Sequence, residues 1–125
     1  MRRAFAFLHD ERGATAAEFG LVLAVFLALV FGILGLSFTV WANSTLQYAA
    51  EAVARCASVN AAVCTNATAT KNYAASVYKG PSISPVFNYI ATGSCGHQVT
   101  ATANMPLDVG LVSMAVPLSA SACFP

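Results

Sequence analysis

The chain has 125 residues, of which 58% are hydrophobic and only 9% are charged, and its formal net charge is +1. Soluble globular domains carry a charge on about a quarter of their residues, so this composition indicates a membrane segment and at most one small domain. The small net charge argues against a nucleic acid or an anionic membrane surface as a partner recognised through bulk charge.

The most apolar part of the chain lies between Phe19 and Trp41. These 23 residues contain no charged side chain, and a helix of that length crosses a hydrocarbon core about 30 Å thick. Fifteen of them are Leu, Ile, Val or Phe, which together favour insertion by roughly 5 to 9 kcal/mol. This gain exceeds the cost of about 3 kcal/mol for one carboxylate, Glu18, at the front edge of the run. The pattern predicts a transmembrane helix over residues 14–42.

The charges around this helix indicate its orientation. Arg2, Arg3 and Arg12 all precede the apolar run, whereas the cations beyond it are widely spaced. Because flanks rich in arginine and lysine stay in the cytoplasm, we expect a cytoplasmic N-terminus and residues 43–125 on the outer side of the membrane.

A second signal lies just before the apolar run, in residues 12–19, RGATAAEF. A short charged segment ends at Gly13, four residues follow, and Glu18 and Phe19 come next. This arrangement resembles the type IV prepilin signature. The longer stretch RGATAAEFGLVLAVFLALVFGILGL is most similar to the TadE-like minor pilins, or pseudopilins, of tight-adherence (Tad, Flp-type) pili. The alternative is an ordinary signal peptide cleaved near Ala42, although its apolar region is normally shorter.

The resemblance implies a pilin-like scheme of processing and assembly. Residues 1–13 are then a cytoplasmic leader, which a membrane-embedded aspartyl prepilin peptidase removes by cutting after Gly13. Ala14 becomes the first residue and gains an α-amine that is largely protonated at pH 7. Glu18 becomes the fifth residue, and in the superfamily this carboxylate meets the α-amine of a neighbouring subunit. An aromatic residue follows it in the family, here Phe19.

Small residues recur on one face of the membrane half. They lie at strict four-residue spacing: Ala16, Gly20, Ala24, Ala28 and Gly32. Ridges of small side chains let apolar helices approach closely, so we expect this face to pack against other helices in an assembled pilus. The alternative is chance, because Ala and Gly are frequent in this chain and in membrane helices. Many relatives carry a kinking proline where this chain has Ala24.

The helix is predicted to continue beyond the membrane. No Pro or Gly interrupts residues 36–64, and small or apolar residues in this part follow the spacing of an amphipathic helix. They are Leu46, Ala49, Ala50, Val53 and Ala57. We expect one helix from about Ala14 to about Ser58, whose outer half carries the head.

All four cysteines, Cys56, Cys64, Cys95 and Cys123, lie beyond the apolar run. An even count in a small exported domain predicts two disulfides, for which three connectivities exist. We favour Cys56 with Cys64 and Cys95 with Cys123, because each pair is local to one part of the head. Eight residues of continuous helix would hold the first pair about 12 Å apart, so their bridge ends the long helix near residues 58–62. A metal site is the alternative, but CxxC and HxxxH spacings are absent.

The remaining sequence predicts a short helix and a small sheet. Residues 66–78, NATATKNYAASVY, can form the second helix, which the following KGPSISP ends. Residues 97–105, HQVTATANM, alternate apolar and polar side chains as half-buried strands do, with VFNYI and LVSMAVPLSASACF as companion strands. Pro117 then marks an edge or a bulge. The predicted fold class is α+β and pilin-like: a long N-terminal helix with a small, disulfide-stapled, antiparallel β-rich head.

These features favour a structural role over catalysis. The first hypothesis is a minor pilin or pseudopilin that takes part in assembling a Tad-type pilus for adhesion and surface attachment. The second is a single-pass, membrane-anchored periplasmic protein with a disulfide-bonded binding domain. Cys95 and His97 have no further acid or base nearby, so we expect no catalytic residue. We also expect no cofactor, metal, nucleic acid or small-molecule substrate.

The resemblance also implies partners and a location. The partners are the prepilin peptidase, other pilins, the pilus assembly platform and membrane lipid. The location is the bacterial inner membrane, with a cytoplasmic N-terminus and a periplasmic C-terminal head. Incorporation into an extracellular pilus would follow from assembly.

Overall fold

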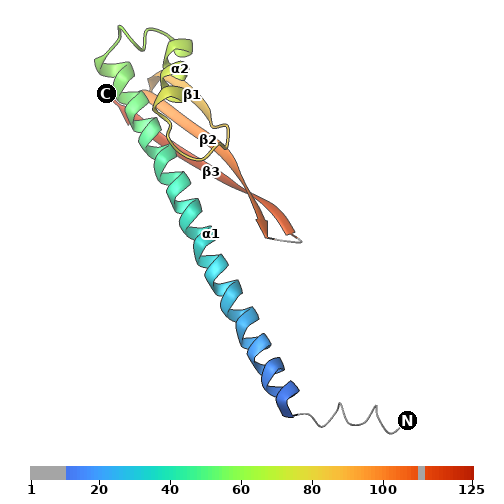
Figure 1. Ribbon diagram of the computed structural model, residues 1–125. Helices are drawn as coiled ribbons and strands as arrows, with labels where there is room; N and C mark the ends of the chain where they lie inside the picture. Colours follow the sequence, from blue (N-terminus) through green and yellow to red (C-terminus); the bar gives the residue numbers. More distant parts are fainter. Residues whose placement is uncertain (1–10, 110–111) are drawn as a thin grey trace. The chain divides into compact units, whose positions relative to one another are not determined.

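In a computed structural model, which describes residues 11–109 and 112–125, the chain forms helices followed by antiparallel strands (Figure 1). The helices are α1 (Glu11–Val59) and α2 (Ala67–Val77), and the strands are β1 (Val86–Gly93), β2 (Gly96–Val109) and β3 (Val112–Phe124). Two compact units divide the chain, Met1–Leu36 and Ser37–Pro125, and α1 contributes to both. The predicted α+β class, with a long N-terminal helix and a small antiparallel sheet, is confirmed.

Helix α1 runs without interruption through the predicted span and ends at Val59, one residue beyond the expected end. Its membrane half is largely uncovered within the chain: Phe19, Phe26 and Leu36 have exposed fractions of 67%, 58% and 70%. Among the described residues, α1 is the one helix that is long and apolar enough to cross a membrane. Lipid or neighbouring helices are the surroundings that such an apolar surface favours.

The end of α1 is formed by a turn that the first disulfide closes. Asn60 donates its N–H to the carbonyl of Cys56 at 2.8 Å, and its own carbonyl accepts from the N–H groups of Val63 and Cys64. The Cα atoms of Cys56 and Cys64 are 6.0 Å apart, and their sulfurs are bonded. A continuous helix would hold these residues too far apart, so the bridge and the helix end occur together, as expected.

Helix α2 begins at a side-chain cap. The Asn66 side-chain oxygen accepts from the N–H of Ala69 at 2.9 Å, which satisfies one of the unpaired donors at the helix start. The buried Thr70 hydroxyl donates to the Asn66 carbonyl at 2.8 Å. The predicted second helix is therefore present, and a local hydrogen-bond pattern fixes where it starts.

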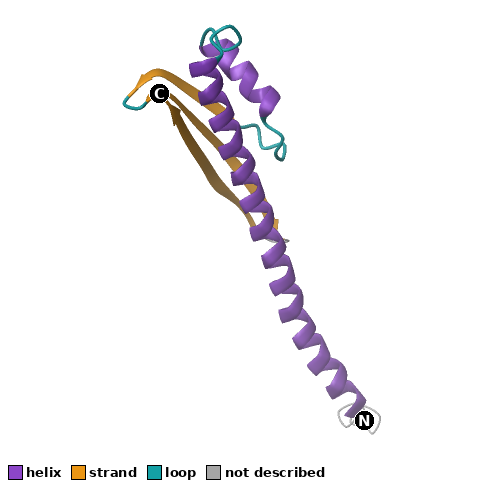
Figure 2. Ribbon diagram, turned by 90° about the vertical axis from the view of Figure 1, so that its left-hand side faces the viewer, coloured by secondary structure: helices purple, strands orange, loops and turns teal. Residues whose placement is uncertain are grey.

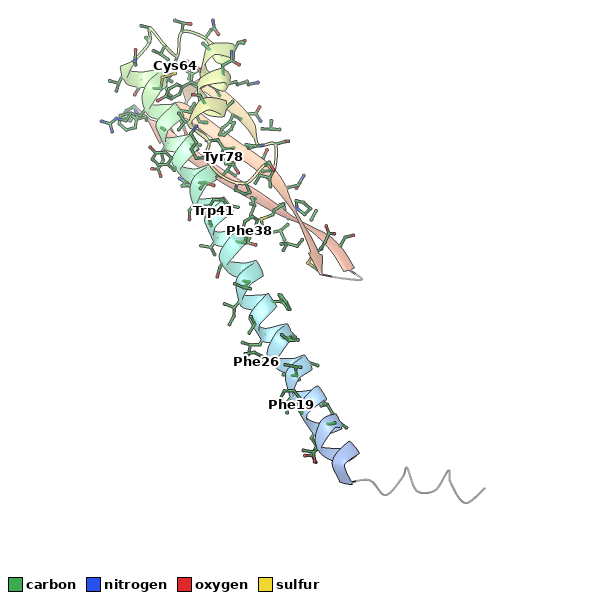
Figure 3. All side chains as sticks on the ribbon, viewed as in Figure 1. Phe19, Phe26, Phe38, Trp41, Cys64 and Tyr78 are labelled. Carbon is green, nitrogen blue, oxygen red and sulfur yellow. A yellow bond between two sulfur atoms is a disulfide. The ribbon has the colours of Figure 1, made fainter. Side chains whose placement is uncertain are left out.

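Tyr78 holds the connection between α2 and β1 against α1 (Figure 3). Its hydroxyl donates to the Pro81 carbonyl at 2.9 Å. Burial raises the pKa of Tyr78 above its usual value, and a hydrogen bond with the Thr45 side chain acts in the opposite direction. A Cβ at Gly80 would overlap the Thr45 hydroxyl and the Tyr78 ring, so a larger residue there would displace the Tyr78 side chain.

The sheet has the order β1-β2-β3, with both neighbouring pairs antiparallel. A short turn joins β1 to β2, and Gly96, the first residue of β2, has a φ of 107°, which L-residues rarely adopt. Strands β2 and β3 pair from His97–Phe124 to Val109–Val112, whereas β1 reaches only as far as Thr102. Beyond β1, the β2–β3 hairpin therefore continues as a two-stranded ribbon (Figure 1).

Two prolines lie in the sheet. Pro117 belongs to the edge strand β3, where a residue without a backbone N–H is tolerated. Pro106 lies in the part of β2 that β1 does not reach, because β1 pairs no further than Thr102. The prediction that Pro117 marks an edge is confirmed.

The core of the head forms between one face of α1 and one face of the sheet (Figure 2). Alanine dominates the helix surface, whereas the sheet surface combines alanine with larger apolar side chains. The buried α1 residues are Ala42, Leu46, Ala49, Ala50, Val53, Ala54, Cys56 and Ala57, and the buried sheet residues are Phe87, Val99, Ala101, Ala103, Met105, Leu118 and Ala120. The five positions predicted to line the amphipathic face of α1 are all buried. The apolar residues of the predicted alternation in β2, Val99, Ala101 and Ala103, are buried as well.

Removing either disulfide is expected to destabilise the head. Removing the Cys95–Cys123 bridge is expected to lower the free energy of unfolding by more than removing the Cys56–Cys64 bridge. Loop-closure entropy gives about 2.6 kcal/mol for the 8-residue separation of Cys56 and Cys64, and about 3.6 kcal/mol for the 28-residue separation of Cys95 and Cys123. Urea titration of the detergent-solubilised chain, followed by near-ultraviolet circular dichroism, compares the two double-alanine variants. A lower midpoint for the Cys56/Cys64 variant would contradict this ranking.

Candidate functional site

The residues assigned to processing lie near the start of α1. Gly13, Ala14, Glu18 and Phe19 are all helical and exposed. Most of the predicted leader, residues 1–10, lies outside the described part of the chain. The four described positions are open to a binding partner.

The Gly13–Ala14 peptide bond belongs to the first turn of α1. The first four N–H groups of a helix have no intrahelical acceptor, so this turn opens more easily than the interior. Glycine further weakens a helix by about 1 kcal/mol relative to alanine. A Cβ added at Gly13 meets nothing within 4 Å. Packing within the described chain therefore does not explain a glycine at this position.

Glu18 lies one helical turn beyond Ala14, and its side chain is exposed. The next charged residue along the chain is Glu51, so a long stretch of helix surface offers this carboxylate no neighbouring charge of its own. The helix dipole stabilises a carboxylate only within the first turn, and Glu18 lies about two turns beyond the first residue of α1, Glu11. In apolar surroundings a cation is the partner that offsets the cost of the charge.

The ridge of small residues is an open helix face. Its members, Ala16, Gly20, Ala24, Ala28 and Gly32, are all exposed. A Cβ added at Gly20 or Gly32 meets nothing within 4 Å. The fold of the chain therefore does not require these two glycines, and the packing role of the ridge stays a prediction.

Cys95 and His97 have structural partners in the head. Cys95 is bonded to Cys123 with a Cα separation of 6.1 Å, so it has no free thiol. The His97 Nδ1 atom is hydrogen-bonded to the Tyr89 hydroxyl at 2.6 Å, and the two rings are stacked. The described residues contain no group of three His, Cys, Asp or Glu side chains that could hold a metal. Tyr89 and His97 therefore form a cross-strand contact between β1 and β2.

Sequence reasoning missed a groove of about 800 Å³ on the head. Its lining combines aromatic, apolar and charged side chains from α1, the turn after it, α2 and β3. They include Tyr48, Glu51, Arg55, Val63, Tyr73 and Phe124. These residues come from α1 with the turn that follows it, from α2 and from β3, so no local pattern brings them together. The lining suits contact with a protein surface and offers no set of metal ligands.

The fold and this segment define a class of protein: one apolar N-terminal helix with an exposed glycine and carboxylate at its start, and a small disulfide-bonded α+β head. Residues 13–55 match the family model described as TadE-like protein. This segment of the chain is therefore similar to the TadE-like family, and the resemblance found in the sequence is confirmed for these residues. No curated protein and no solved structure gives a significant match.

Proposed function

We propose that the chain is a minor pilin of the Tad type, which a prepilin peptidase cuts after Gly13 and which takes part in building an adhesive pilus. The observation that carries the proposal is the TadE-like match, which starts at Gly13 and extends through Glu18 into the outer helix. Major Flp-type pilins are usually little more than the helix. The additional head beyond Val59 therefore favours a minor subunit.

Cleavage would create the cation that Glu18 lacks. With the leader removed, Ala14 begins the helix with an α-amine whose reference pKa is near 8. The amine and the carboxylate then lie one turn apart on every subunit. Two neighbouring helices can pair them reciprocally, which neutralises both charges in apolar surroundings.

The same proposal assigns the membrane topology. The apolar half of α1 spans the bacterial inner membrane, and the arginine-rich flank keeps the N-terminus in the cytoplasm. The head is then periplasmic, where oxidising conditions permit both disulfides. Lipid, the peptidase, other pilins and the assembly platform are the partners of this scheme.

N-terminal sequencing of the membrane-extracted chain tests the proposal. In cells that contain the peptidase, the mature chain is expected to begin at Ala14. In cells that lack it, the chain is expected to keep its leader. A chain that begins at Met1 or Arg2 in both strains would refute processing and, with it, the pilin assignment.

The groove on the head supports one alternative, a membrane-anchored periplasmic binding protein. Tyr48 and Phe124, with exposed fractions of 65% and 39%, present apolar surface there beside Arg55. This alternative needs no cleavage after Gly13. The N-terminal analysis therefore separates the two functions.

Placing a large side chain on the small-residue ridge is expected to block assembly. Ala24→Phe and Ala28→Phe would push neighbouring helices apart, because close approach depends on small side chains. Val22→Phe, on the opposite side of the same helix, is the matched control. Co-purification with other pilus components measures the effect. If both ridge variants assemble as the Val22 variant does, the ridge is not the packing face.

A further inference from the structure

The sheet of the head has a long open edge on the side of β3. In the order β1-β2-β3, the described residues give β3 one neighbouring strand, β2. Strand β3 has 13 residues, contains no charged side chain and pairs with β2 without a bulge. Beyond Pro117, every residue of the strand has a backbone N–H group. Charges, bulges or covering segments protect most edges, and an edge without them is a template for a further strand.

The opposite edge of the sheet is protected. Strand β1 has 8 residues, its pairing with β2 shifts register between Ile90 and Gly93, and α2 packs against it. Irregular or covered edges are poor templates for a further strand. Of the two edges, β3 therefore offers the better pairing surface.

The groove of about 800 Å³ on the head follows the end of the β3 edge. Residues 121–124 of β3 all line it, whereas none of its lining residues in the described chain belongs to β2. Successive side chains of a strand face opposite sides of the sheet, so the free edge of β3 is the surface that presents all four residues to one groove. One flank of α1 forms the other wall, with Gln47, Glu51, Arg55 and Val59 at four-residue spacing.

The Gln47 side chain connects the two walls. Its Nε2 atom donates to the Ser121 carbonyl at 3.2 Å and to the Glu51 carboxylate at 3.1 Å. A backbone carbonyl of β3 thus accepts a hydrogen bond from outside the sheet. The same contact gives the acidic side chain of the groove a donor within the chain.

The groove also presents a cation and apolar surface to solvent. Arg55 is exposed, and no described residue forms an ion pair or a side-chain hydrogen bond with its guanidinium. Tyr48, Val59 and Phe124 have exposed fractions of 65%, 72% and 39%. Exposed aromatic and apolar side chains beside an arginine are typical of sites that bind proteins.

These features together specify the chemistry of the occupant. An open strand edge pairs with an extended backbone, whose side chains alternate between two sides. Those that face α1 would cover Tyr48 and Phe124, so they are apolar. A guanidinium without a partner selects a carboxylate. Strand β3 carries no carboxylate, so pairing with β3 of a second copy would leave Arg55 unpaired.

We propose that the β3 edge binds an extended segment of another protein, rich in apolar residues and carrying one acidic side chain. The segment adds a fourth strand beside residues 118–124 and places its carboxylate at Arg55. This contact depends on the head alone and not on cleavage after Gly13.

Peptide binding to the detergent-solubilised full chain tests the proposal. The probe is a short synthetic peptide of alternating valine and threonine with one central aspartate. It is expected to bind and to slow hydrogen exchange at those β3 amides beyond Pro117 that do not bond to β2, as measured by residue-resolved NMR. The same peptide, N-methylated at every backbone nitrogen, keeps its side chains but cannot donate hydrogen bonds. It should not bind.

Arg55→Gln is expected to weaken binding of the aspartate peptide by roughly tenfold or more, because a charge-assisted hydrogen bond is lost. Lys71→Gln is the matched control, since Lys71 is an exposed cation of α2 outside the groove. This variant should bind the peptide as the parent does. A peptide with asparagine in place of aspartate should bind the parent and the Arg55→Gln chain equally.

Several outcomes would overturn the proposal. They are failure of the aspartate peptide to bind, equal binding of its N-methylated form, and equal affinity of the Arg55→Gln and Lys71→Gln chains. If the β3 amides are protected without peptide and lose this protection on dilution, a second copy occupies the edge and the proposal is wrong. Cleavage after Gly13 is measured separately, so this contact and the pilin assignment can fail independently.

Discussion

Gly13→Leu is expected to leave the chain uncut while its head folds as in the parent. The side chain would meet nothing within the chain, since a Cβ at this position has no neighbour within 4 Å. It would, however, stand beside the bond to be cut and strengthen the first turn of α1 by about 0.8 kcal/mol or more relative to glycine. Intact mass of the membrane-extracted chain, with the peptidase present, measures the leader directly.

Gly35→Leu is the matched control for this prediction. Gly35 lies in the same helix, and a Cβ added there also meets nothing within 4 Å. If helix stabilisation alone prevented cleavage, both variants would keep the leader. If the side chain at residue 13 blocks the peptidase directly, only the Gly13→Leu chain keeps it. If the leader is removed from the Gly13→Leu chain at the parental rate, the peptidase does not recognise this glycine.

Glu18→Gln is expected to abolish assembly without preventing cleavage or membrane retention. The change keeps the shape of the side chain but removes the charge that would pair with the Ala14 amine of a neighbour. Breaking a desolvated ion pair by removing one partner costs about 3 to 5 kcal/mol, or roughly a hundredfold or more in association. Membrane insertion becomes easier, because glutamine carries no charge into the apolar layer.

The assembly defect is measured by co-purification of the cleaved chain with other pilus components. Glu51→Gln is the control, since Glu51 is an exposed carboxylate of the same helix whose partner is the Gln47 side chain at 3.1 Å. It should assemble as the parent does. Equal assembly of the two variants, or loss of the Glu18 variant from the membrane, would contradict the proposed pairing.

Local patterns were sufficient to predict most of the fold. The uncharged run and its four-residue repeats predict α1, and α1 extends only a few residues beyond the expected bounds. Alternation around Val99 predicts β2, because neighbouring side chains in a strand face opposite sides. The strand is longer than expected, however, and reaches Val109 through pairing with β3. That extension depends on a partner strand, which residue order does not reveal.

Some residues of the candidate site were predicted from the sequence, and others are brought together only by the fold. Gly13, Glu18 and Phe19 are adjacent in sequence, so a motif identifies them and the helix geometry follows. The groove beside Arg55 brings together α1 with its following turn, α2 and β3, and its existence depends on how these elements pack on one another. The pairing of Cys95 with Cys123 was favoured from locality among three connectivities, and the folded β3 brings the two residues within bonding distance.

Residue order alone therefore predicts the apolar helix, the motif from Gly13 to Phe19 and the helical face that becomes the core, because each depends on spacing within a few helical turns. The extension of the β2–β3 hairpin beyond β1 and the close contact of Gly80 with the Tyr78 ring arise only in three dimensions. They depend on register and on packing between segments that are far apart in the chain, and these interactions leave no local period to detect.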